Sequence, residues 1–108
     1  MSHQEWITKQ NDTKPLEAIL SDEDGPVNLT GSTVVFSMWD AEKAIKVDER
    51  PVTLVAPLVG SVKWPPVAAE TDTVGTFRGE FQVTFTDATV VTFPHNGYIA
   101  IKILAEVT

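Results

Sequence analysis

The chain has 108 residues, of which 43% are hydrophobic and 21% are charged. These values are ordinary for one folded domain, and they exclude wholesale disorder and a second core of similar size. Fifteen acidic residues against eight basic ones give a formal charge of −7, which disfavours contact with nucleic acid or an anionic membrane. The absence of cysteine excludes disulfides, thiolate catalysis and cysteine-based zinc sites.

Neither a membrane span nor a secretory signal is visible in the sequence. No apolar run approaches the roughly 20 residues that cross a bilayer. The first six residues lack the basic and apolar regions of a signal peptide. We therefore expect a protein that is made in a cytoplasm and leaves it only by lysis.

Short strands separated by turns are predicted as far as residue 39. Residues 5–9 form either a short first strand or a terminal arm, and the expected arm covers residues 1–6. Residues 16–21 alternate in polarity, which predicts a second strand, and an acidic turn follows at 22–26. Residues 33–39 form the next strand.

Both faces of the strand at 33–39 are partly apolar. One face holds Val34, Phe36 and Met38, and the other holds Val35, Ser37 and Trp39. A domain of this size has one core, so the second face requires another cover. That cover is either the N-terminal arm folded back or a neighbouring subunit.

The middle of the chain predicts three brief strands and one helical turn. The strands are expected at 45–47, 52–56 and 61–64, and the last of them ends at Pro65-Pro66 because proline cannot donate to a ladder. Residues 67–73 favour helix but are too few for more than one or two turns.

The clearest pattern lies between residues 75 and 94. One face of an extended chain holds Phe77, Gly79, Phe81, Val83 and Phe85, and polar residues hold the other. This period of two predicts a strand with one buried face. Asp87-Ala88 interrupts the pattern, which then resumes, so the segment is interpreted as a β-hairpin.

The C-terminal strand completes the fold prediction. Ile99, Ile101 and Ile103 alternate with more polar neighbours and should pack near the phenylalanines of the hairpin. About eight short strands with turn signals every 8–12 residues or so are typical of an all-β sandwich or barrel. We predict one domain over residues 1–108: an immunoglobulin-like antiparallel β-sandwich of about seven to nine short strands with at most one short helical turn.

Two groups of polar residues have the chemistry of metal ligands. The carboxylates of Asp22 to Asp24 would suit calcium, but the longer ligand series of an EF-hand is absent, so an exposed turn is the preferred interpretation. His3 and His95 could serve zinc or acid–base chemistry, but their spacing favours exposed side chains. We expect no bound metal and no cofactor.

No enzymatic activity is expected. The sequence has no nucleophile-elbow motif and no glycine-rich loop that opens a helix. Four scattered carboxylates, those of Glu70, Asp72, Glu80 and Asp87, leave a small hydrolase with a carboxylate pair as one alternative.

Three tryptophans, Trp6, Trp39 and Trp64, stand out among the apolar residues. Tryptophan is rarely fully buried and is enriched at protein interfaces. Core packing is the simplest interpretation, and a protein interface built on these three residues is the functional one. A carbohydrate-binding module that uses them as sugar platforms is a further alternative.

Several short segments together suggest a family. They are Lys9 to Leu16, Asp24-Gly25, Val27 to Phe36, Asp72 to Phe77, Glu80 to Val83, Thr92 to Pro94, and Gly97 to Ile99. In their order and spacing, over about residues 7–104, they resemble the N-terminal domain of phage baseplate upper proteins. This is a small β-sandwich family of tailed phages that infect Gram-positive bacteria.

The resemblance implies a structural role in a virion. The expected function is that of a non-enzymatic tail or baseplate protein that contacts other phage structural proteins and forms homo-oligomers. In that family a long extension follows this domain, whereas this chain ends at Thr108. We therefore expect a stand-alone virion component or an accessory protein of a prophage structural module.

Overall fold

The computed structural model describes residues 4–94 and 97–106. The strands are β1 (Gln4–Lys9), β2 (Leu16–Ile19), β3 (Ser21–Asp22), β4 (Gly25–Pro26), β5 (Thr33–Trp39), β6 (Ile45–Pro51), β7 (Thr53–Ala56), β8 (Ser61–Trp64), β9 (Gly75–Thr84), β10 (Val90–Phe93) and β11 (Ile99–Leu104). Two 3₁₀ turns, η1 (Pro57–Val59) and η2 (Ala68–Glu70), are the helical elements of the described part.

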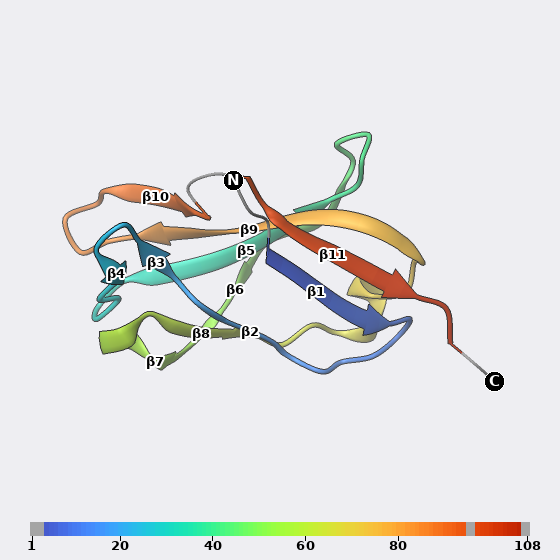
Figure 1. Ribbon diagram of the computed structural model, residues 1–108, viewed down its shortest axis with the longest axis horizontal. Coiled ribbons are helices and arrows are strands. Elements are labelled where there is room, and N and C mark those ends of the chain that lie inside the picture. Colours follow the sequence, from blue (N-terminus) through green and yellow to red (C-terminus); the bar gives the residue numbers. More distant parts are fainter. Residues whose placement is uncertain (1–3, 95–96, 107–108) are drawn as a thin grey trace.

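Two layers of β-sheet form the domain (Figure 1). The larger sheet has the order β1-β11-β9-β5-β6, with β10 also paired to β9, and the smaller has the order β2-β8-β7. The two-residue strands β3 and β4 form a separate small hairpin, and they account for the strands beyond the predicted seven to nine. The all-β sandwich is confirmed, and its immunoglobulin-like connectivity stays a prediction.

The long strand β9 organises the larger sheet. It pairs with β5 along one edge, and with β11 and then β10 along the other. The predicted hairpin is therefore confirmed as β9 and β10. Phe77, Phe81 and Val83 are buried as expected, whereas Phe85 is only partly buried because it lies beyond the end of β9, where the turn begins.

Aromatic rings connect the two sheets through the core. Trp64 of β8 stacks on Phe36 of β5 with ring centroids 4.3 Å apart, and Phe36 in turn lies 5.1 Å from Phe81 of β9. The rings of Trp6 from β1 and Trp64 meet edge to face, with their centroids 5.9 Å apart. Since such ring pairs add to the free energy gained from buried area, this row fixes how the layers sit on each other.

Gly79 allows β9 to pack closely against this row. A Cβ atom at this position would lie 2.6 Å from a ring carbon of Phe36 and 2.7 Å from the Cδ1 of Ile101. Both distances are too short for real carbon contacts. Gly79 lies on the buried face of β9, and its neighbours Phe36 and Ile101 fill the space that a side chain would need.

The N-terminal segment is a strand where the structure describes it. Residues 4–9 form β1 and pair in parallel with β11, so the predicted terminal arm is wrong for residues 4–6, and residues 1–3 lie outside the described part. The loop between β1 and β2 is anchored by the buried Thr71, whose hydroxyl donates to the Asp12 carbonyl at 2.8 Å. The predicted helical turn is confirmed as η2.

Candidate interaction surface

The three tryptophans lie in three different environments. Trp64 is fully buried at 0% exposure, so it belongs to the core, and its proposed role at an interface or sugar platform is wrong. Trp6 is partly buried and packs against the core. A signal for Trp64 was present in the sequence, because Val62 and Trp64 alternate with the more polar Ser61 and Lys63.

Trp39 lies on the outer side of the larger sheet. Its neighbour Met38 is fully buried, and side chains alternate along a strand, so Trp39 points away from the core. The register of β5 and β9 places it directly opposite Arg78. Opposed side chains on one face of antiparallel strands have Cβ atoms about 5 Å apart. Ile45, which is 67% exposed, pairs with Trp39 from β6 on the other side.

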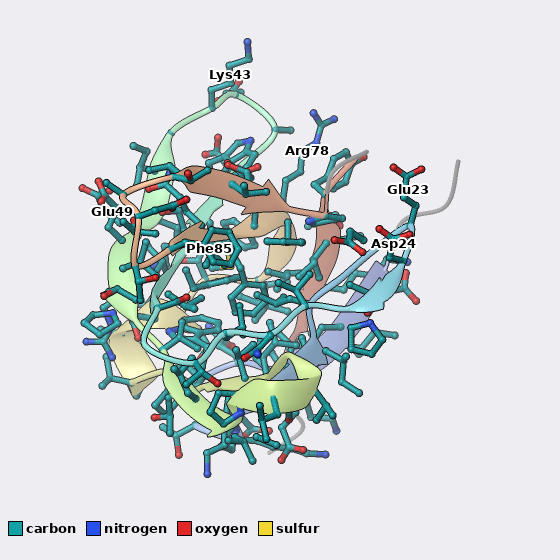
Figure 2. The ribbon with its side chains drawn as sticks, turned by 90° about the vertical axis from the view of Figure 1, so that its left-hand side faces the viewer. Glu23, Asp24, Lys43, Glu49, Arg78 and Phe85 are labelled. Carbon is teal, nitrogen blue, oxygen red and sulfur yellow. The ribbon has the colours of Figure 1, made fainter. Side chains whose placement is uncertain are left out.

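Arg78 also contacts the aromatic ring of Tyr98, which lies just before β11. Its guanidinium carbon lies 4.7 Å from the ring centroid of Tyr98, which is a cation–π contact. Arg78 is exposed and points outward from the upper layer in Figure 2. Within residues 4–94 and 97–106 its guanidinium forms no hydrogen bond or ion pair.

Glu80 follows Arg78 on the same outer side of β9. It lies opposite Ser37 of β5 and is partly buried. Burial raises the pKa of its carboxyl above the ordinary value, because the charged form loses hydration there. Among the described residues, no hydrogen bond or ion pair compensates this loss.

We call the surface formed by Trp39, Arg78, Glu80 and Tyr98 the Trp39–Arg78 face. Tryptophan, tyrosine and arginine are the residues that contribute most to binding at protein interfaces. The loop at 40–44, with Lys43 near its tip, projects beyond the larger sheet (Figures 1 and 2). Its backbone is held by Asp40, whose carboxylate accepts from the N–H groups of Glu42 and Ala44.

Sequence reasoning identified one member of this face and missed the others. Trp39 was recognised from its residue type and from the apolar second face of its strand. The alternation along β9 does place Arg78 and Glu80 on the outer side. Their closeness to Trp39 and Tyr98 depends on the pairing register between distant strands, which no local pattern encodes.

The candidate metal residues fall into two groups. Asp22 ends β3, and Glu23 and Asp24 form the exposed turn to β4, where the Asp22 carboxylate accepts from the Asp24 N–H at 2.8 Å. Figure 2 shows Glu23 and Asp24 at the surface. Among residues 4–94 and 97–106, no three acidic or histidine side chains form a group suited to a metal ion. His3 and His95 lie outside the described residues.

The four carboxylates of the hydrolase alternative have separate surroundings. Glu70 forms an ion pair with Arg50 at 2.9 Å, and Asp72 forms one with Lys46. The Lys46 hydrogen bond lowers the pKa of Asp72. Asp87 lies in the β9–β10 turn, where hydrogen bonds from Thr89 lower its pKa. Glu80 lies on the outer side of β9.

The chain is thus an all-β sandwich domain with an aromatic and charged surface on its larger sheet. No family model matches the sequence, and no curated protein does. No helix in the described part is long and apolar enough to span a membrane.

Solved structures share the fold, and two of them match over nearly the whole chain. The N-terminal domain of phage TP901-1 ORF48 has a TM-score of 0.62 and 15% identity, over 98% of this chain and 86% of that one. CopC from Methylosinus trichosporium OB3b has a TM-score of 0.53 and 14% identity, over 100% of this chain and 89% of that one. The resemblance to a phage N-terminal domain is therefore confirmed at the level of the fold.

Proposed function

We propose that the protein is a non-enzymatic structural protein of a phage or prophage tail or baseplate. It acts in the virion through contacts with other phage structural proteins and with further copies of itself, and not through nucleic acid or membrane. The observation that carries the proposal is the fold shared with the N-terminal domain of phage TP901-1 ORF48 over nearly the whole chain. The motifs that resemble baseplate upper proteins support the same assignment.

The Trp39–Arg78 face supports a role in protein contact. It joins an aromatic ring, an arginine stacked on a second ring, and a carboxylate on a broad sheet surface. Protein interfaces have this composition, with aromatic residues and arginine near the centre. We therefore place a contact between virion subunits on this face.

The burial of the tryptophans weakens the carbohydrate-binding alternative. A sugar platform requires a ring with an exposed flat side. Trp64 has none, and Trp6 packs against the core with its ring near Trp64. Only Trp39 of the three remains available on the larger sheet.

The test is the presence of the protein in assembled particles. Particles purified from the phage or prophage that encodes the chain should contain it, and Trp39→Ala should reduce its incorporation about tenfold or more, as expected for an interface tryptophan. The thermal unfolding midpoint should change little, because the side chain is partly exposed. Leu58→Ala is the matched control, since Leu58 is 72% exposed but belongs to η1, next to the smaller sheet.

Two results would contradict the proposal. One is the absence of the protein from purified particles that carry all other tail proteins. The other is specific binding to a glycan that Trp39→Ala abolishes while incorporation is unchanged, which would favour the carbohydrate-binding module.

A further inference from the structure

Two opposite charges on the Trp39–Arg78 face are unpaired. Arg78 and Glu80 occupy alternate positions on the outer side of β9, so their Cα atoms are about 7 Å apart. Neither forms an ion pair with the other, or with any residue that the structure describes. The three ion pairs of this part of the chain, Lys46–Asp72, Arg50–Glu70 and Lys102–Glu5, all involve other residues.

The position of each group favours an external partner. The Tyr98 ring lies against the Arg78 guanidinium, which limits its motion and leaves its N–H groups free for a carboxylate. The Glu80 carboxyl is partly buried, and it has lost hydration without gaining a cation. A face with both features is complementary to another face that presents the same two charges in reverse order.

We propose that a second copy of this chain covers the Trp39–Arg78 face in a two-fold dimer, in which Arg78 of each copy pairs with the partner's Glu80. This inference rests on the proposed function and names the partner of its surface. A two-fold axis that lies between the two facing sheets and runs across the strands above Gly79 reverses the strand direction, so position 78 of one copy faces position 80 of the other. The single two-fold rotation therefore gives Arg78 and Glu80 of both copies a partner of opposite charge.

The same operation also accommodates the tryptophan. In the register of the sheet, Met38 pairs with Gly79, Trp39 with Arg78, and Ser37 with Glu80. The axis therefore also runs above Met38 of β5 and places Trp39 opposite the partner's Ser37. A large ring then faces a small side chain, which gives room for two sheets to pack about 10 Å apart.

The net charge does not prevent this arrangement. Each copy carries −7, which opposes association at long range. Charges separated by more than about 8 Å are largely screened at physiological ionic strength. The close pairs between Arg78 and the partner's Glu80 are screened much less, because contact removes water from them.

Charge reversal tests the arrangement by sedimentation of the whole chain over a range of concentrations. Arg78→Glu and Glu80→Arg should each weaken dimerisation about 100-fold, because like charges then face each other twice. An equimolar mixture of the two variants should dimerise again, since every facing pair is then opposite in charge. The double variant should likewise dimerise with itself but not with the parent.

Matched reversals on the smaller sheet serve as the control. Glu17 and Lys63 are directly opposed on the outer side of β2 and β8, so Glu17→Arg and Lys63→Glu should leave dimerisation unchanged. A second measurement avoids charge reversal: in Arg78→Lys, a carbodiimide should link Lys to the partner's Glu80 and give a covalent dimer. Adding Glu80→Gln should abolish that product.

Several outcomes would overturn the inference. They are a parent that remains monomeric at all concentrations, single variants that dimerise like the parent, or a mixture and double variant that both stay monomeric. A parent that is monomeric in solution but enters particles in a Trp39-dependent way would contradict only this dimer. Absence from particles would contradict the proposed function instead.

Discussion

At the scale of single residues, the degree of burial of each phenylalanine ring decides how much that ring contributes to the free energy of unfolding. Phe81 is fully buried and lies 5.1 Å from Phe36, whereas Phe85 beyond the end of the same strand is only partly buried. Both rings satisfy the same period-two pattern in the sequence. The pattern therefore assigns a face to each residue, and the length of the paired strand sets the burial.

Phe81→Ala should lower the free energy of unfolding by about 3–5 kcal/mol, because it removes transfer free energy and leaves a cavity. Phe85→Ala should cost clearly less, since part of that ring remains in water. Chemical denaturation of the two variants measures both values. Equal losses, or a Phe81 variant as stable as the parent, would contradict the assignment of the core.

Glu80 and Asp87 should respond to pH in opposite ways. Burial raises the pKa of Glu80, so the stabilisation that comes from its protonated form is complete below about 4.5 and is lost as the pH rises through the raised value. Glu80→Gln should therefore stabilise the monomer at pH 7, with the gain vanishing in acid. Thermal unfolding at low protein concentration, where monomers prevail, measures this.

Asp87 supplies the contrast in the same experiment. Hydrogen bonds from Thr89 lower its pKa, so its contribution is present above about 3.8 and falls as the pH drops below that value. Asp87→Ala should destabilise the protein at pH 7 and less so in acid. A Glu80→Gln gain that is independent of pH would show that the carboxyl is not desolvated.

At the scale of elements, the β9–β10 hairpin shows how a turn sets a register. The Phe85 N–H donates to the Thr89 carbonyl at 2.8 Å, and the Ala88 N–H donates to the Phe85 carbonyl at 2.9 Å. Ala88 takes a φ of 72°, a left-handed conformation that costs a residue with a side chain about 1–2 kcal/mol. Pairing of Phe93 with Phe81 follows from this turn.

Ala88→Gly should raise the free energy of unfolding by up to about 1 kcal/mol, since relief of the left-handed strain exceeds the entropy lost by a flexible residue. Ala100→Gly in β11 is the matched control and should destabilise, because Ala100 does not have a positive φ. The unfolding midpoints of the two variants give the comparison. Destabilisation by both substitutions would mean that Ala88 carries no strain.

At the scale of the whole molecule, the sequence predicted the class of fold but not its assembly. Alternating patterns in β9 and β11 identified the buried faces, because burial on one side of a strand requires a period of two. Nothing local identified β1 as the parallel neighbour of β11, because that pairing joins residues from opposite ends of the chain. The Trp39–Arg78 face depends on the same kind of distant register, so only Trp39 was predicted.

The parallel pairing of β1 with β11 has a consequence for the order of events during synthesis. In its sheet β1 has one neighbour, and that neighbour consists of residues 99–104. β1 therefore has no strand partner in this sheet until residues 99–104 have been synthesised. Pairing across so long a stretch of chain is slow to form, so β1 joins the sheet late in folding, and the edge-to-face contact of Trp6 with Trp64 depends on that late step.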